Sequence, residues 1–444
     1  MRCGTLFLAT LFLSGLLAID ASAETLSIKG SNTLGAHLTP ALAEKFLESR
    51  GCKTVSRLRK GVDHVLVKGD STCAGLGIDI EARGTASGFA ALNTGSAQLA
   101  MASRPVNAAE QAQLPALSDP EMEQVIALDG LAIIVAPSNP LRSLSLAQVR
   151  DLFIGESNSL AAVGGPAGPV KRYTRDNASG TFDTFKHLVL ADAKLAADSQ
   201  RFESSEELVN AVMRDPQGIG FVGLAAVGDA RALRISGSNT DAMAPSEFSV
   251  ATEDYLLSRR LYLYHLPDAS ALTLAFIDFT RSSAAMALIE REHFVAPSVR
   301  AFTPRLARTL PAEYLALTQG MARLSLNFRF ADGVSLLDSK SLADLERLSG
   351  WFRAQAQKPT IVLIGFSDGN ESLPYLSMAL STDRVDYVAQ RLNVAGVVVN
   401  KARGLGSVVP LADNAGGLGR QKNRRVEVWV SVTPTVTQAE TREP

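Results

Sequence analysis

The sequence predicts an α/β protein followed by a smaller α+β unit. Residues 24–290 alternate short apolar strands with helical patterns, which is typical of a sheet covered by helices. Residues 322–432 begin and end with alternating apolar side chains and carry two helical patterns between them. A chain of 444 residues is also too long for one hydrophobic core and favours two or three folding units.

Three strands of the first unit end in a small, hydroxyl-bearing loop that opens a helix. These loops are Gly30-Ser31-Asn32-Thr33, Gly84-Thr85-Ala86-Ser87-Gly88 and the stretch from Arg175 through Asp176 to Ser179-Gly180-Thr181. Helix N-termini carry unpaired N–H groups and partial positive charge, glycine lets the backbone approach a ligand, and hydroxyls add donors. Ligands of open α/β sheets lie beyond the carboxyl ends of the strands. The loops therefore predict an oxyanion site with Arg175 as its full positive charge, whereas each loop alone is equally consistent with an ordinary helix cap.

The motifs of residues 24–290 resemble, in the same order, those of the PstS-like substrate-binding proteins of phosphate ABC importers. Besides the three loops, the resemblance covers Met101-Ala102-Ser103-Arg104-Pro105, 129–132, 215–221 and 257–262. It implies a two-lobed periplasmic binding protein, type II-like, that closes on phosphate and serves an ABC permease. The implied phosphate-binding residues are Ser31, Asn32, Thr33, Thr85, Ala86, Ser87, Ser103, Arg104, Arg175, Ser179, Gly180 and Thr181.

One position bears on which oxyanion is bound. In several family members an Asp follows the Ser of the Ala-Ser motif and accepts the proton of hydrogen phosphate, but here that position is Arg104. Asp129 and Asp176 are the candidate replacements, although Asp176 is equally suited to orient Arg175. The resemblance therefore favours phosphate and leaves sulfate or another oxyanion open.

The last third of the chain carries three short motifs, which are Gly-Phe-Ser-Asp-Gly at 365–369, Leu-Ser-Thr-Asp-Arg at 380–384 and Asn-Arg-Arg-Val-Glu at 423–427. An Asp after a strand and an Arg on the next helix suit an ammonium and a carboxylate, because a guanidinium can make paired charge-assisted hydrogen bonds. The periodicity predicts the order strand, helix, strand, helix, strand, strand. Asp338 is the expected N-cap of the first helix.

On these motifs residues 322–432 resemble the OmpA-like peptidoglycan-binding domain, of βαβαββ order. The resemblance implies that Asp368 accepts from the amine of diaminopimelate and that Arg384 binds its carboxylate. The implied peptidoglycan-binding residues are Asp368, Ser377, Arg384 and Arg424, with Ser377 replacing the usual Asn. Phe366 and Ser367 replace the family's His and Thr. The alternative is a retained scaffold that meets no ligand.

The N-terminus predicts export. Arg2 precedes an apolar run over 6–18 and the small residues Ala21-Ser22-Ala23, which is the pattern of a signal peptide over 1–23. Spanning a membrane takes roughly 20 apolar residues, and no other segment approaches that length. We expect a periplasmic protein, associated with the cell wall or outer membrane.

The mature chain retains two cysteines, Cys52 and Cys73. An even pair in an oxidising compartment favours a disulfide, here closing an irregular loop rich in Lys and Arg. Two buried thiols are the alternative.

Charge and histidine spacing argue against other functions. The net charge of -1 gives no field for nucleic acid. The five histidines are scattered without metal-ligand spacing, and no Gly-x-Ser-x-Gly turn occurs. We expect neither an enzyme nor a bound cofactor or metal.

These observations predict a phosphate or oxyanion binding protein, tethered non-covalently to peptidoglycan and acting in capture, sensing or transport. Residues 291–321 are the expected linker, with some helix near 312–319, and 433–444 the expected disordered tail. The alternative is a structural envelope protein whose binding module is an interaction surface without ligand.

Overall fold

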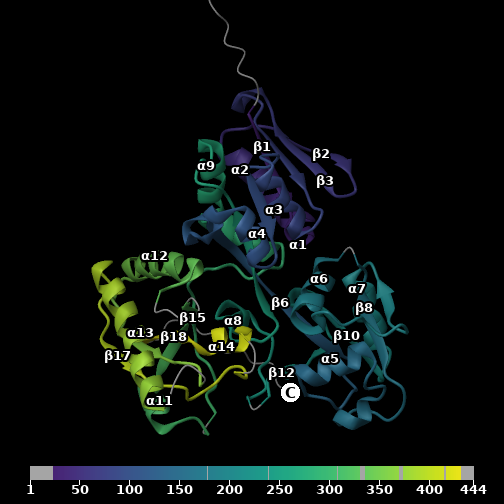
Figure 1. Ribbon diagram of the computed structural model, residues 1–444, viewed down its shortest axis with the longest axis vertical. Helices are drawn as coiled ribbons and strands as arrows, with labels where there is room; N and C mark the ends of the chain where they lie inside the picture. Colours follow the sequence, from purple (N-terminus) through teal and green to yellow (C-terminus); the bar gives the residue numbers. More distant parts are fainter. Residues whose placement is uncertain are drawn as a thin grey trace, which may run out of the picture.

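The computed structural model describes residues 24–177, 179–238, 240–307, 309–330, 336–369, 374–414 and 417–431. The predicted signal peptide (1–23) and the predicted tail (433–444) lie outside the described residues. Figure 1 shows three bodies: the N-terminal lobe A, the second lobe B, and a C-terminal module that lies beside both.

Lobes A and B share one mixed sheet of order β2-β3-β4-β1-β5-β13-β6-β10-β8-β9, with β11 also pairing with β6. The strands are β1 (Thr25–Gly30), β2 (Val55–Gly61), β3 (His64–Gly69), β4 (Gly77–Glu81), β5 (Leu99–Ala102), β6 (Glu123–Val135), β8 (Lys171–Arg175), β9 (Gln200–Phe202), β10 (Gly218–Gly223), β11 (Arg231–Ala232) and β13 (Ser258–Tyr264). A separate parallel pair joins β7 (Ser143–Ser145) to β12 (Arg234–Ser236).

Strand β6 passes from one lobe into the other. Its first half pairs with β13, from Glu123 opposite Tyr264 to Gly130 opposite Ser258. Its second half, 131–135, pairs with β10 of lobe B. The apolar side chains change core at the same point, because Ala127 packs in lobe A and Leu128 in lobe B. Strands β6 and β13 therefore form the hinge.

Helices cover both lobes. Those of lobe A are α1 (Asn32–Gly35), α2 (Leu38–Ser49), α3 (Thr85–Asn93), α4 (Ala108–Gln113), α9 (Ala271–Thr280) and α10 (Ser283–Arg291); those of lobe B are α5 (Leu146–Ile154), α6 (Gly180–Phe185), α7 (Ser205–Met213) and α8 (Glu247–Ala251). A π-helical turn (Lys186–Leu190) continues α6. The three expected strand–loop–helix units are thus present as β1–α1, β4–α3 and β8–α6.

The C-terminal module is a five-stranded sheet of order β14-β15-β18-β16-β17. Its elements are β14 (Ala301–Phe302), α11 (Ala312–Thr318), β15 (Met321–Arg329), α12 (Ser339–Ala354), β16 (Ile361–Gly365), α13 (Pro374–Val394), β17 (Lys401–Gly404), α14 (Gly417–Asn423) and β18 (Arg425–Ser431). The expected order is present, with the short helix α14 added before the last strand. Asp338 caps α12 as predicted by accepting a hydrogen bond from the Ser341 N–H.

The segment expected to be a linker is integrated into this module. Strand β14 pairs with the edge of β15, and the expected helix is present as α11. Tyr314 of α11 packs edge-on against Trp429, and its hydroxyl donates to Glu427 at 2.9 Å. Proline content and weak periodicity suggested a connector because they do not reveal these long-range contacts.

Buried ion pairs join the module to the hinge. Arg323 of β15 lies 2.8 Å from the Asp254 carboxylate. Arg260 of β13 lies 2.6 Å from Glu253 and 2.8 Å from Asp338. Every one of these side chains is largely inaccessible to water, so the charges depend on each other for compensation.

Cys52 and Cys73 form a disulfide, with Cα atoms 4.9 Å apart. The enclosed segment is not the irregular loop expected, because its charged residues lie on the β2–β3 hairpin at the sheet edge. The mixed charged and apolar sequence of this segment is as compatible with exposed edge strands as with a loop. Gly69 packs against the bridge, since an added Cβ would lie 2.3 Å from the Cys52 Sγ.

Among the described residues no single helix has the length and apolar composition to cross a membrane. Helices α9 and α10 satisfy the test only together and are bent by 64°. Both contribute to the lobe A core, through Phe276 and Ile277 in one and Leu288 and Ile289 in the other.

Replacing both cysteines (Cys52→Ser with Cys73→Ser) should lower the free energy of unfolding by about 3 kcal/mol, because the bridge closes a loop with a sequence separation of 21. Urea unfolding of both proteins, with and without a thiol reductant, measures this. Reductant should destabilise only the parent protein; equal stability of the two oxidised proteins would contradict the prediction.

The ionic cluster predicts sensitivity to acid. Burial raises the pKa of Glu253, but the charges of Arg260 and Lys340 outweigh it and place the pKa well below the usual 4.5. The folded pKa lies below the unfolded one, so this stabilisation is complete above pH 4.5 and is lost as the pH falls. Glu253→Gln should cost about 3 kcal/mol near neutral pH and flatten the acid dependence. Urea midpoints across the acid range test this.

The control is Glu247→Gln, which breaks a half-exposed pair with Arg300. It should change the free energy of unfolding by less than about 1 kcal/mol. An acid dependence of the Glu253 variant as steep as that of the parent would show that this carboxylate does not carry the effect.

Candidate functional site

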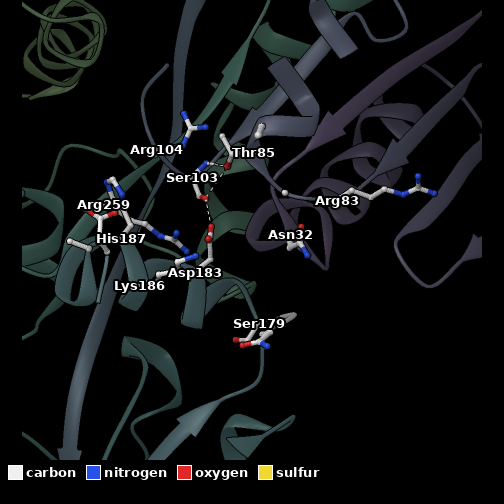
Figure 2. A pocket seen from close by; sticks show the side chains of 15 residues that line it. Asn32, Arg83, Thr85, Ser103, Arg104, Ser179, Asp183, Lys186, His187 and Arg259 are labelled. Carbon is white, nitrogen blue, oxygen red and sulfur yellow. Dashed lines mark hydrogen bonds between the residues drawn. The ribbon is translucent and has the colours of Figure 1, made fainter. Parts of the chain in front are cut away.

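A cleft of about 700 Å³ opens between the lobes beside the hinge (Figure 2). It is lined by Asn32, Arg83, Gly84, Thr85, Ala86, Ser103 and Arg104 from lobe A, by Asn177, Ser179, Asp183, Lys186, His187, Ala191 and Asp192 from lobe B, and by Arg259 from β13. The cleft thus contains loops from both lobes and one hinge residue.

Lobe A contributes an uncapped helix end. Helix α3 follows Gly84, whose φ of +95° favours glycine, and no side chain caps its first N–H groups. Thr85 Oγ1 accepts from the Ser103 N–H at 3.1 Å, which joins this helix to the end of β5. The buried Ser31 Oγ, behind the cleft, has no hydrogen-bond partner among the described residues. These groups leave donors available to an anion.

Lobe B contributes the loop that starts α6. Ser179 caps the helix by accepting from the N–H of Thr181 and Phe182. Asp176 Oδ1 accepts from the Ser179 N–H at 2.9 Å, so this carboxylate orders the loop. A Cβ on Gly180 would lie 2.2 Å from Thr33 Oγ1, which shows how closely the lobes approach here.

Arg259 joins the lobes from the hinge. Its Nη2 donates to Thr33 Oγ1 at 2.8 Å in lobe A and to the Gly180 carbonyl at 2.9 Å in lobe B. Asp129 on β6 pairs with the same nitrogen at 3.2 Å. Burial lowers the pKa of Arg259 and raises that of Asp129, while each partner's charge opposes the shift of the other.

Arg175 lies differently from the prediction. Its guanidinium donates to the carbonyls of Phe202 at 3.3 Å and Glu203 at 2.7 Å and to the Ser205 hydroxyl, and it is not among the residues lining the cleft. Arg104 does line the cleft, but it forms a two-point pair with Glu110 at 2.8 and 2.7 Å.

The other predicted residues divide into three groups. Those lining the cleft are Asn32, Thr85, Ala86, Ser103, Arg104 and Ser179. Those directly behind it are Ser31, Thr33 and Gly180. Ser87 and Thr181 lie within the first turns of α3 and α6, where Ser87 Oγ donates to the Gly84 carbonyl at 2.8 Å.

The sequence reasoning missed the remaining charged residues of the cleft. They are Arg83, Asp183, Lys186, His187, Asp192 and Arg259. Arg259 belonged to the recognised 257–262 motif, and Asp183 and Lys186 lie one turn apart after the third loop. A helical projection of 180–187 would have placed both on one face.

In the C-terminal module, Asp368 and Arg424 meet in a buried pair at 3.1 Å. Ser377 contacts the Ser367 hydroxyl at 2.5 Å. The Arg384 guanidinium lies over the Phe330 ring, 5.3 Å from its centre. Asp368 is 0% and Arg384 2% exposed, so the predicted ligand groups are gathered but covered.

Among the described residues, no group of three or more His, Cys, Asp or Glu side chains is placed so that it could hold a metal ion.

A family model for the PBP superfamily domain matches residues 54–284, over half of the chain, and the protein therefore belongs to that superfamily. The protein SphX of Synechococcus elongatus is 27% identical over 246 residues, covering 52% of this chain and 73% of SphX. The phosphate-binding protein PstS of Borreliella burgdorferi is 22% identical over 262 residues, covering 57% of this chain and 90% of PstS.

Among solved structures, an ABC-type phosphate transport receptor from Vibrio cholerae is 24% identical and aligns with a TM-score of 0.49. The alignment covers 61% of this chain and 100% of the receptor. The predicted α/β binding-protein class is thus confirmed for the first part of the chain by the family match.

Proposed function

We propose that residues 24–290 bind inorganic phosphate, or a similar oxyanion, between lobes A and B. The observation that carries this is Arg259, a buried cation on the hinge that donates to both lobes at the edge of the cleft. The name of the relative PstS, a phosphate-binding protein, agrees with phosphate as the ligand.

Lys186 is the second cation in our proposal. It lines the cleft on the turn after α6, and no carboxylate within the described ranges forms an ion pair with it. The open end of α3 and the Ser179 hydroxyl add neutral donors. Together these groups offer an oxyanion charge and directed hydrogen bonds without a metal.

We further propose that residues 322–432 hold the protein to peptidoglycan, with Asp368, Ser377, Arg384 and Arg424 around the diaminopimelate. Support comes from the motifs, from the Asp368–Arg424 pair and from the position of Arg384 over Phe330. Because these side chains are buried, ligand entry requires the atoms that cover them to move. On this proposal the protein captures, senses or delivers phosphate at the cell wall in the periplasm, with an ABC permease as a further partner.

For the oxyanion site, Arg259→Gln should weaken phosphate binding by roughly 100-fold, because several charge-assisted hydrogen bonds are lost. Lys186→Gln should weaken it by roughly 10-fold. Titration calorimetry on the full chain measures both. Lys194→Gln, an exposed lysine outside the cleft, is the charge-matched control and should bind like the parent.

Arg175→Gln separates the two candidate arginines. Since its guanidinium is held by backbone carbonyls outside the cleft, we expect a smaller loss than for Arg259→Gln. A large loss for Arg175→Gln alone would restore Arg175 as the ligand cation. No oxyanion heat from the parent protein would refute the site, and the melting temperature of each variant checks its folding.

For the tether, purified peptidoglycan sacculi should retain the full chain and release the Asp368→Asn, Arg384→Gln double variant. Both substitutions remove charge and keep a polar side chain, and Asp368→Asn does so at nearly constant volume. The exposed Arg353→Gln, on the last turn of α12, is the control and should be retained. Equal retention of a folded double variant, judged by its melting temperature, would refute the proposed ligand groups.

A further inference from the structure

We propose that Asp183 is the residue that selects a protonated oxyanion over a fully ionised one. This inference rests on the proposed oxyanion site and concerns only which anion that site accepts. Asp183 lies on the first turn of α6 in lobe B and points across the cleft toward lobe A (Figure 2).

The contact that Asp183 makes is between the lobes. Ser103 Oγ donates to Asp183 Oδ2 at 3.2 Å, and the same hydroxyl lies 3.2 Å from Thr85 Oγ1. A hydroxyl and a carboxylate from opposite walls thus meet inside the cleft, beside the open end of α3. An anion that binds beside Ser103 would lie next to this carboxylate.

The charge of Asp183 is not neutralised by a direct partner. Burial lowers the pKa of Arg259 and of His187, and the Asp183 charge opposes both shifts. Yet Arg104 is paired with Glu110 and Arg259 with Asp129, and across the described ranges no cation forms an ion pair with Asp183. Its Oδ1 likewise accepts no hydrogen bond from a described residue. Asp183 therefore remains an accepting, negatively charged group beside the donors of Ser103 and the start of α3.

Such a group discriminates by protonation. Hydrogen phosphate carries an O–H that can donate to the carboxylate in a charge-assisted hydrogen bond. Sulfate of the same charge has no proton to donate, so its oxygens meet Asp183 as like charges. Asp129 pairs with Arg259 and Asp176 accepts from the Ser179 N–H, so both of these carboxylates are engaged, while the exposed Asp192 makes no hydrogen bond or ion pair with lobe A among the described residues.

The test compares phosphate and sulfate binding to the full chain by calorimetry, at about pH 8, where both anions are doubly charged. The parent protein should bind phosphate and reject sulfate. Asp183→Asn should lower the ratio of phosphate to sulfate affinity by roughly 10- to 100-fold and should show measurable sulfate binding. Gain of a ligand cannot arise from misfolding, so the readout does not depend on stability.

Asp229→Asn is the matched control, with the same charge change on an exposed turn of lobe B, and should leave the ratio unchanged. A selective parent with an equally selective Asp183→Asn variant would overturn this inference and leave the oxyanion site intact. A parent that binds both anions equally would also overturn it. A parent that binds neither anion would overturn the proposed function itself.

Discussion

Two consecutive arginines on the hinge strand β13 connect every part of the molecule. Successive side chains of a strand point to opposite faces of its sheet. Arg259 therefore faces the cleft and contacts Thr33, Gly180 and Asp129. Arg260 faces the other way and pairs with Glu253 and with Asp338, the cap of α12. One strand thus carries both the central cation of the proposed ligand site and the anchor of the C-terminal module.

The contact between the C-terminal module and β13 consists of buried ion pairs, and this determines how it contributes to stability and geometry. Buried ion pairs often contribute little net stability, because desolvation opposes their attraction. They do fix geometry, since a displaced partner leaves an uncompensated charge. Lys422 shows the same constraint: its ammonium donates to the carbonyls of Glu253 and Tyr255 and to the Ser258 hydroxyl at 2.7, 2.9 and 3.1 Å. The loop leading into β13 is therefore held in one position by the C-terminal module.

The sequence carried the local part of this architecture. Periodicity located β1, β4 and β8, and the Asp338 cap and the helix near 312–319 follow from short-range chemistry. The disulfide was predicted from the even number of cysteines in the mature chain and from the oxidising compartment. The sequence does not show the direction in which a side chain points. Arg175 donates hydrogen bonds to the carbonyls of Phe202 and Glu203, and a linear motif does not reveal these contacts. A helical projection places Asp183 and Lys186 on one face, but that this face lines a cleft opposite Ser103 depends on the packing of the two lobes.

The hinge contacts also change how the two modules should be regarded. Separate motifs suggested a binding domain and a wall domain joined by a linker, which would let each be studied alone. In the structure, removing the C-terminal module would take Arg323 away from Asp254 and Asp338 away from Arg260, and would leave Arg260 with Glu253 alone, next to Arg259 on the same strand. Each exposed charge would favour a local rearrangement of β13. The geometry of the cleft between the lobes is therefore a property of the whole chain, and the module beside the hinge forms part of its framework.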